Sequence, residues 1–284
     1  MNISKTIQET RQAVSSARGA GRRIGFVATM GAFHEGHLSL IRTCKLECDY
    51  TVVSIYVNPT QFGPSEDFDQ YPRNFDRDCD RCREEGVDLV FMPSDQEMYP
   101  EKNISWVEVK TLTDHLCGRS RPDHFRGVCT VVAKLFGIVR PDVSYFGQKD
   151  AQQTAVIERM VRDLNFGIEI RRCPTVRESD GLAMSSRNIY LSDSERQEAS
   201  CLWRALERAS ELAAAGEDDC QVIIAQMHKV IEQSPSARID YISIVDNELL
   251  QPLSRIDRQV LVALAVKIGK SRLIDNILVD RLEK

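Results

Sequence analysis

Two histidines three residues apart are the part of this 284-residue sequence best suited to chemistry on a phosphate. His34 and His37 enclose Gly36 in a polar stretch that follows a short apolar run, residues 24–29, and opens a segment with helical character. Glycine lets a ligand approach the backbone closely, and a helix start presents free N–H groups and a positive dipole end. Two imidazoles on one side of that helix start could donate hydrogen bonds to charge that develops on phosphate oxygens. The motif therefore predicts nucleotide chemistry.

The same stretch nearly matches a P-loop, because Gly31 and Gly36 have four residues between them. A P-loop requires a lysine after the second glycine, and His37 stands in that position, so we reject the P-loop interpretation. Two other interpretations of the motif remain open. The histidines could bind a metal ion, although the sequence offers no obvious further ligands, or they could lie on a surface turn without a function.

Three further polar segments contain groups that suit an anionic substrate. Gln61 follows the strand expected at residues 50–57, and its amide offers both a donor and an acceptor to hydroxyls and a carboxylate. Lys149 lies just before Asp150, which has the position of a helix N-cap, so its ammonium could face an anion at that helix start. Two serines and an arginine at residues 185–187 could clamp phosphate oxygens. Each segment also has an interpretation without a role in binding. These are a plain loop for Gln61, a helix cap for the segment of Lys149, and an interdomain turn for residues 185–187.

The elements that must position these groups alternate in type over the first two-thirds of the chain. An N-terminal helix is expected to carry Ile3, Ile7, Thr10 and Val14 on one face. The expected strands cover residues 24–29, 50–57, 88–92, 143–146 and 168–172, and the expected helices cover residues 37–48, 75–85, 128–139 and 151–164. Continuous apolar strands alternating with helices predict an α/β fold with a Rossmann-like, doubly wound parallel sheet. Ligands of such sheets bind at the carboxyl ends of the strands, where the polar segments above are expected.

The pattern changes in the last third of the sequence. A polar loop at about residues 175–188 precedes Ser192 and Glu195, which form a capping-box pattern expected to open one long helix to about Ala215. A second helix and strands at about residues 238–245, 260–266 and 273–279 follow. We therefore expect a Rossmann-like domain at residues 1–176 and a smaller C-terminal α+β domain at residues 177–284.

Composition excludes several classes of function. Hydrophobic residues make up 42% and charged residues 28%, and the formal net charge is −5, which disfavours a general nucleic-acid role. No apolar run approaches the roughly 20 residues of a membrane span, and no apolar signal core opens the chain. Nine irregularly spaced cysteines do not suggest a secreted disulfide framework, so we expect a cytoplasmic protein.

Taken together, the motifs occur in the order and spacing of a known family. The sequence resembles the pantothenate synthetases (pantoate–β-alanine ligases), members of the nucleotidyltransferase superfamily with a His-x-Gly-His motif. The segments that carry the resemblance are the His34–His37 motif and residues 58–62, 121–125, 146–153 and 184–188. It is densest from about Gly25 to Leu191. The chain departs from the usual family pattern at Phe33, Tyr56 and Asp123, and the last of these bears on the geometry of the Arg121 loop.

The resemblance implies an ATP-dependent condensation of pantoate with β-alanine through a pantoyl adenylate, with release of AMP and diphosphate. Mg²⁺ is the implied cofactor, with no protein ligand identified, and a homodimer through the N-terminal domain is the implied assembly. His37, His34 and Lys149 are the implied catalytic residues. Gln61, Gln153 and Arg121 are the implied substrate-binding residues. The implied ATP-binding residues are Met30, Gly31, His34, Gly36, His37, Gly147, Gln148, Lys149, Asp150, Val176, Met184, Ser185, Ser186 and Arg187.

Two rival functions remain at this point. A cytidylyltransferase-like enzyme would share the histidine motif but would not require Gln61 and Gln153 as an acid-binding pair. A catalytically silent nucleotide-binding or RNA-binding protein could retain the fold, although the joint presence of His37, Lys149 and Arg187 argues against it.

Overall fold

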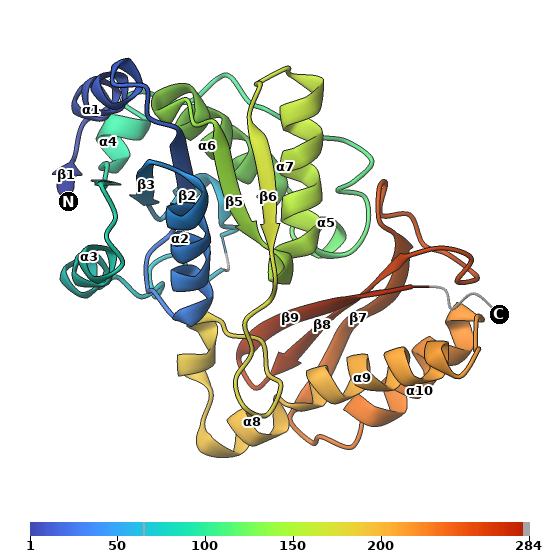
Figure 1. Ribbon diagram of the computed structural model, residues 1–284. Helices are drawn as coiled ribbons and strands as arrows, with labels where there is room; N and C mark the ends of the chain where they lie inside the picture. Colours follow the sequence, from blue (N-terminus) through green and yellow to red (C-terminus); the bar gives the residue numbers. More distant parts are fainter. Residues whose placement is uncertain (65, 281–284) are drawn as a thin grey trace. The chain divides into compact units, whose positions relative to one another are not determined.

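The computed structural model describes residues 1–64 and 66–280, and the chain divides into two compact units (Figure 1). The first unit comprises Met1–Lys110, Arg121–Gln148 and Gln153–Pro174. The second unit comprises Thr111–Ser120, Lys149–Gln152 and the chain from Thr175 onward. Two short segments from the middle of the chain thus belong to the second unit.

Strands and helices alternate through the first unit. Its strands are β1 (Asn2–Ser4), β2 (Ile24–Thr29), β3 (Tyr50–Ile55), β4 (Leu89–Phe91), β5 (Val143–Gly147) and β6 (Glu169–Cys173). Its α-helices are α1 (Ile7–Gly19), α2 (Glu35–Glu47), α3 (Phe75–Glu84), α4 (Asp95–Met98), α6 (His124–Val139) and α7 (Ala151–Asp163), the last of which begins within the second unit. This unit also contains the single-turn 3₁₀ helix η1 (Pro59–Gln61). A further 3₁₀ helix, η2 (Gln148–Asp150), begins at the end of the first unit and has Lys149 and Asp150 in the second.

The six strands form one parallel sheet in the order β1-β4-β3-β2-β5-β6. From β2 the chain proceeds outward through β3 to β4, and it then returns to place β5 on the other side of β2. This reversal is the switch point at which doubly wound sheets bind ligands, outside the carboxyl ends of the strands. The predicted doubly wound α/β fold is confirmed, and β2 and β5 are the strands that flank the switch point.

Alternating side chains of the strands pack against different helices, as the two-residue period of a strand requires. Val27, Val53 and Ile55 belong to an apolar cluster that also contains Leu38, Ile41 and Cys44 of α2 and Cys82 of α3. Phe26 of β2 instead meets Phe136 of α6 with ring centroids 6.4 Å apart. Helices on both faces therefore bury the strands and fix the direction in which each strand end points.

The N-terminal residues correct one expectation. Ile3 lies in β1, paired with Val90 of β4, and is 47% exposed, so it is not part of the first helix. That helix begins after Thr6, whose hydroxyl accepts the Glu9 N–H while the Glu9 carboxylate accepts the Thr6 N–H. The capping box makes a sharp start at this point, and the preceding residues become the outer strand of the sheet.

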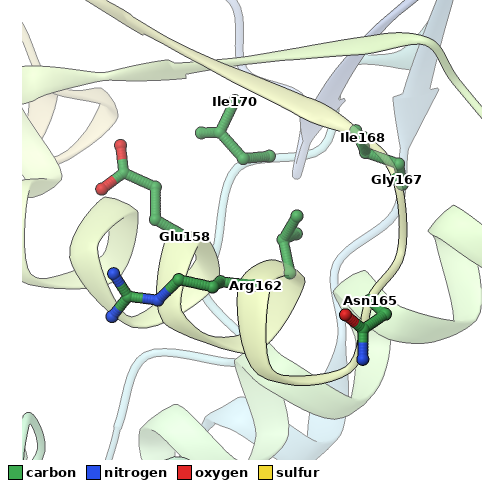
Figure 2. Close-up of a pocket in the computed structure, with 7 residues that line it drawn as sticks. Glu158, Arg162, Asn165, Gly167, Ile168 and Ile170 are labelled. Atoms are coloured by element: carbon green, nitrogen blue, oxygen red, sulfur yellow. The ribbon is translucent and has the colours of Figure 1, made fainter.

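A surface hollow of about 450 Å³ lies beside the amino end of β6 (Figure 2). Glu158 and Arg162 project from α7, while Asn165 and Gly167 lie in the turn that leads to the strand. Substrates of doubly wound sheets bind at the opposite ends of the strands. We therefore do not assign the nucleotide to this hollow.

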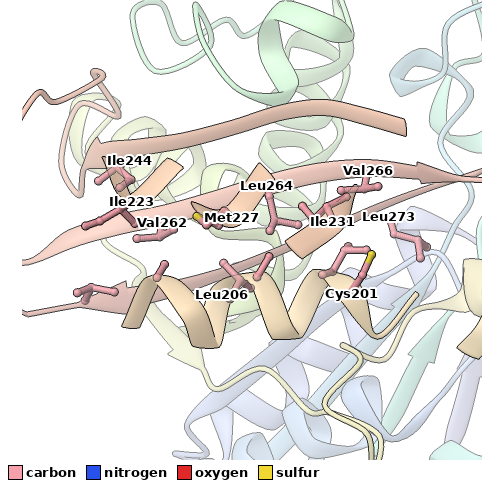
Figure 3. Close-up of a cluster of buried hydrophobic side chains, with 14 of the residues drawn as sticks. Cys201, Leu206, Ile223, Met227, Ile231, Ile244, Val262, Leu264, Val266 and Leu273 are labelled. Atoms are coloured by element: carbon pink, nitrogen blue, oxygen red, sulfur yellow. The ribbon is translucent and has the colours of Figure 1, made fainter. Parts of the chain in front are cut away.

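The second unit contains an antiparallel sheet in the order β7-β8-β9. Its elements are α5 (Cys117–Ser120), η3 (Ser186–Tyr190), α8 (Asp193–Glu198), α9 (Cys201–Ala214), α10 (Cys220–Ile231), β7 (Ala237–Asp246), β8 (Val260–Ile268) and β9 (Ser271–Val279). Figure 3 shows the core between the helices and the sheet, where Leu206 of α9 and Met227 of α10 face Val262 and Leu264 of β8. The predicted small α+β domain is confirmed.

The long helix expected after Ser192 is two helices. The capping box of Ser192 and Glu195 is present and opens α8, which ends at Glu198 before α9 begins at Cys201. Ala199 and Cys201 are both fully buried at this junction. Within residues 1–64 and 66–280, no helix is long and apolar enough to cross a membrane.

Candidate active site

The histidine loop connects β2 to α2 and places both imidazoles at the helix start. His34 is the N-cap, and its Nδ1 accepts the Gly36 N–H at 3.1 Å. The His34 N–H in turn donates to Nδ1 of His37 at 3.4 Å, and the two ring centroids are 4.1 Å apart. A ring nitrogen that accepts an N–H bond carries no proton of its own, so each neutral imidazole holds its proton on Nε2. Backbone contacts thus make Nε2 of both rings the donor atom.

Gly36 is required for this arrangement because the His34 ring lies directly over it. A Cβ atom at this position would be 2.9 Å from both Cε1 and Nδ1 of His34. Such contacts are shorter than side chains tolerate, so the ring would have to rotate away and release the Gly36 N–H. The glycine in the motif therefore serves the histidine as well as the approach of a ligand.

Asp78 anchors the loop from α3 and was not singled out by sequence. Its side chain is 2% exposed, with one carboxylate oxygen accepting the Ala32 N–H at 2.8 Å and the other the Phe33 N–H at 2.9 Å. Gly31 fits against the same carboxylate with a φ of +81°, a conformation that favours glycine. The loop that carries His34 is thus held by a buried charge on another helix.

Gln61 lies at the carboxyl end of β3 and contacts the histidine loop. Its side-chain Nε2 approaches Sδ of Met30 at 3.2 Å, so the predicted ATP-binding and substrate-binding loops meet within the first unit. Its Oε1 accepts a hydrogen bond from Nδ2 of Asn58 at 3.2 Å. Asn58 is 1% exposed, also donates to the Gly127 carbonyl, and accepts from Tyr99 at 3.0 Å. Asn58 therefore orients the Gln61 amide, a role that an ordinary loop interpretation missed.

Arg121 lies near the backbone carbonyl of Gln61. Its guanidinium donates to both carboxylate oxygens of Glu66, at 2.7 and 2.6 Å, and to Nε2 of His124 at 3.0 Å. His124 Nδ1 is 2.8 Å from the Gln61 carbonyl oxygen, which fixes the ring with its proton on Nδ1. Burial opposes ionisation of Glu66, but the hydrogen bonds and charge of Arg121 hold its pKa below the ordinary value. Arg121 therefore supports the Gln61 loop through His124, which binds the Gln61 carbonyl, while Glu66 holds the guanidinium.

The end of β5 supplies the next group of predicted residues. Gly147 ends the strand, and Gln148 to Asp150 form η2 immediately before α7. Lys149 has a side chain that is 20% exposed, with Nζ 3.8 Å from Oδ1 of Asp150. Gln153 is partly buried in the first turn of α7. These positions agree with the strand-to-helix junction that the sequence predicts.

Gln152 has a structural role that the sequence did not reveal. Its Oε1 accepts the Cys117 N–H at 2.9 Å, and its Nε2 donates to the carbonyls of Leu112 and His115 at 2.8 and 2.9 Å. The side chain is 7% exposed and has its polar atoms satisfied by the backbone of Thr111–Ser120. Gln152 therefore ties the two short segments of the second unit together, close to Lys149 in the chain.

The predicted phosphate clamp lies at the end of a small hairpin in the second unit. The Met184 N–H donates to the Val176 carbonyl at 3.0 Å, and Arg177 pairs with Ala183 across the hairpin. Ser185 then caps η3, because its hydroxyl accepts the Arg187 N–H at 3.3 Å. The hairpin therefore holds Val176 beside Met184, where residues 184–187 begin.

The part of the chain that the structure describes contains no preformed metal site. Among residues 1–64 and 66–280, no group of three His, Cys, Asp or Glu side chains could hold an ion.

The sheet and its loops define a class before any comparison is made. A parallel sheet reverses its winding beside β2, and the loop at that point presents two oriented imidazoles at a helix start. These features are those of a Rossmann-like α/β enzyme that acts on a phosphate-bearing nucleotide.

Comparison with known proteins narrows this class to one family. The family model for pantoate-beta-alanine ligase matches residues 2–278. A pantothenate synthetase of Caldicellulosiruptor bescii is 53% identical over 280 residues, with 99% of each chain covered, and one of Thermotoga petrophila is 54% identical over 276 residues, with 97% of this chain and 99% of the relative covered. The chain belongs to the pantoate–β-alanine ligase family.

Solved structures agree with this assignment. A pantothenate synthetase from Thermus thermophilus superimposes with a TM-score of 0.93 at 44% identity, covering 98% of this chain and 99% of the other. The pantoate-beta-alanine ligase of Francisella tularensis, complexed with beta-gamma ATP and beta-alanine, gives a TM-score of 0.81 at 35% identity, with 98% and 97% covered.

Proposed function

We propose that this ligase condenses (R)-pantoate with β-alanine at the expense of ATP and releases pantothenate, AMP and diphosphate. Family membership over residues 2–278 supports the reaction. The Francisella relative, complexed with an ATP species and β-alanine, supports these two substrates. The observation in this chain that carries the proposal is the pair of imidazoles at the start of α2, each with Nδ1 occupied by a backbone N–H.

The chemistry requires activation of a carboxylate, which by itself resists attack by an amine. The pantoate carboxylate attacks the α-phosphorus, a P–O bond to the β-phosphate breaks, and diphosphate leaves with its electron pair. The β-alanine amine then attacks the carbonyl of the pantoyl adenylate, loses a proton, and displaces AMP. Both steps depend on positioning and on stabilising negative charge.

His34 and His37 meet this requirement through their Nε2 protons. We assign His37 the hydrogen bond to the phosphate oxygens on which charge develops and His34 a second one. Lys149 supplies the positive charge that neutralises the α-phosphate in the transition state. Donors held by backbone contacts need no reorganisation as the charge forms, which is the usual source of electrostatic catalysis.

The remaining nucleotide contacts come from loops that precede or follow strands. Met30, Gly31 and Gly36 line the nucleotide beside the histidines. Gly147, Gln148, Asp150, Val176 and Met184 are assigned to its pocket, and Ser185, Ser186 and Arg187 to its phosphates. We further propose that residues 177–284 act as a lid domain and that residues 1–176 bind ATP and pantoate.

Pantoate is assigned to Gln61 and Gln153. The Gln61 amide is oriented by Asn58, so its donor and acceptor directions are set before substrate binds. Arg121 takes part through His124, whose Nδ1 donates to the Gln61 carbonyl, and Glu66 holds the Arg121 guanidinium in place. This gives Arg121 an indirect place in the substrate-binding set. Gln61 also lies in the loop to which we assign β-alanine.

Mg²⁺ is assigned to the phosphates of ATP. Magnesium is commonly bound by one or two carboxylates together with substrate phosphates and water, so a preformed cage of side chains is not required. The ion would shield the phosphate charge when bound. Removal with EDTA and restoration with MgCl₂ test this assignment, and activity that is unchanged by EDTA would contradict it.

We also propose a homodimer formed through the first unit and a cytoplasmic location. Leu46 on α2 and Leu164 after α7 are 87% and 52% exposed, which gives this unit apolar surface for a second copy. The cysteines are free and buried, which suits a reducing compartment. Light scattering should give a mass of about twice 32.2 kDa, and a monomer would contradict the assembly.

The decisive experiment measures AMP and diphosphate from ATP, pantoate and β-alanine. We expect AMP release to require pantoate and to fall at least about 100-fold in His37→Ala, because one preorganised donor is commonly worth this factor. His228→Ala, at a half-exposed histidine on α10, serves as the matched control and should retain the parent rate. AMP release that ignores pantoate, or transfer of a nucleotide from CTP to a phosphorylated acceptor, would reject the proposal.

A further inference from the structure

Two polar residues are buried next to each other in β9, a strand whose other buried members are mostly apolar. Asp275 is 2% exposed and Asn276 is 5% exposed, and they pair with Leu264 and Ala263 of β8. Burial of a carboxylate and an amide is costly unless each has hydrogen-bond partners. The partners of these two residues are loops to which we assign the nucleotide.

Asp275 holds the base of the hairpin that leads to residues 184–187. Its two oxygens accept from Nη1 and Nη2 of Arg177, at 2.6 and 3.0 Å. The same guanidinium donates to the Gly181 carbonyl at 3.0 Å and stacks on Trp203 at 3.9 Å. Burial raises the pKa of Asp275, whereas the charges of Arg177 and Lys149 oppose this rise. The hairpin is therefore fixed to β9 by a buried, two-pronged ion pair.

Asn276 holds the backbone of the other loop. Its Nδ2 donates to the Lys149 carbonyl at 2.9 Å. Successive side chains of a strand point to opposite faces of the sheet, so Asp275 and Asn276 reach their partners from opposite sides of β9. One two-residue stretch thus sets the positions of Lys149 and of the Val176–Met184 hairpin together.

We infer that Asp275, Asn276 and Arg177 form a positioning unit for Lys149 and the phosphate clamp. The inference rests on the proposed function, because it takes Lys149 and residues 184–187 to act on the nucleotide. None of the three needs to touch substrate. Their effect is to keep Lys149 and residues 184–187 at a fixed separation while the α-phosphate of ATP reacts. A displacement of 1 Å at such a site costs about 100-fold in rate.

Asn276→Ala tests the inference because it removes the bond to the Lys149 carbonyl and leaves every assigned nucleotide contact in place. We expect kcat for pantoate-dependent AMP release to fall about 10- to 100-fold. The KM for β-alanine should stay within twofold of the parent value. Asn247→Ala, at a partly exposed asparagine whose amide meets Gln259, is the matched control and should match the parent. A merely structural role of Asn276 would lower the melting temperature and the active fraction without this selective loss of kcat.

A double-mutant cycle on ATP-analogue binding gives a readout that does not need turnover. Calorimetry with α,β-methylene-ATP compares the parent, Asn276→Ala, Lys149→Ala and the double variant. If Asn276 acts through Lys149, its substitution weakens binding in the parent and adds less than twofold in the Lys149→Ala background. Full additivity, or a folded Asn276→Ala with normal kcat, overturns the inference.

The controls separate this inference from the proposed function. A parent enzyme without pantoate-dependent AMP release refutes the function itself, whereas an active parent with an equally active Asn276→Ala refutes only the positioning unit. If Asn276→Ala does not fold, the same measurements use Asn276→Ser. Failure of both to fold would assign Asn276 to the stability of the second unit and would also overturn the inference.

Discussion

We predict that Asp78→Asn slows adenylate formation by loosening the loop that carries His34. The Asp78 carboxylate accepts one backbone N–H on each oxygen, from Ala32 at 2.8 Å and from Phe33 at 2.9 Å. Asparagine keeps the shape of the side chain but offers only one acceptor oxygen. Its NH₂ group must then face one of the two N–H donors.

The size of the effect follows from these contacts. A hydrogen bond to a charged group contributes about 1.5–3 kcal/mol, and a buried donor left unpaired costs about 1–3 kcal/mol. We therefore expect a loss of about 2–4 kcal/mol from this site, since one bond is lost and the other loses its charge. An unfolding free energy of about 5–15 kcal/mol leaves the chain folded at room temperature. The loss falls on residues 31–33, so kcat should fall about 10- to 100-fold as the imidazole pair is displaced.

The assay combines urea unfolding with pantoate-dependent AMP release. Asp80→Asn is the matched control, because Asp80 lies on the same helix with a 66% exposed side chain and pairs with Arg83 on the surface. This control should keep the parent stability to within about 0.5 kcal/mol and the parent rate. If Asp78→Asn matched Asp80→Asn in both measurements, the buried carboxylate would not hold the loop and our reasoning would be refuted.

Three further predictions follow from the same structure. Gly36→Ala should lower kcat about 10- to 100-fold with little change in melting temperature, because its Cβ displaces the His34 ring; a normal rate would contradict this contact. The pKa of Glu66 is lowered against the effect of burial by Arg121, so its contribution to stability is present above the ordinary value of 4.5 and is lost as the pH falls. The stability gap between the parent and Glu66→Gln, measured by urea unfolding, should therefore shrink below pH 4.5, and a constant gap would be evidence against the pairing. Burial raises the pKa of Cys44 to about 12, and all nine cysteines are buried, so Ellman's reagent at pH 8 should titrate them only on unfolding; fast labelling of the native protein would count against this packing.

Local sequence patterns were sufficient for the elements that frame the site. Residues 24–29 form β2 as expected, because a short, continuous apolar run followed by a glycine is typical of a buried strand. A helix opening in the histidine motif was also expected, although the expected range began at His37 and α2 begins at Glu35. Ile3 was misassigned because its spacing to Ile7 fits a helix, whereas pairing with β4 decides its structure. A three-residue strand has too little local pattern to compete with such periodicity.

Polar contacts between residues far apart in the chain could not be predicted from the sequence. Asp78 lies among other acidic and basic residues of an amphipathic helix, and only the fold brings it to a loop 45 residues away. Arg177 and Asp275 are 98 residues apart, and each is an ordinary charged residue by itself. The roles assigned to Lys149, Gln153 and the clamp remain predictions that the experiments above address.

The two short segments that the second unit takes from the middle of the chain affect how this protein can be dissected. A fragment that begins at Thr175 would lack Lys149–Gln152 and Thr111–Ser120. It would expose the faces of Tyr241 and Arg272 that contact Cys117 in the intact chain. A fragment that ends at Pro174 would carry those segments without their sheet. Expression of either half should therefore yield aggregated or protease-sensitive material, and a stable minimal version of the smaller unit would have to graft both segments onto it.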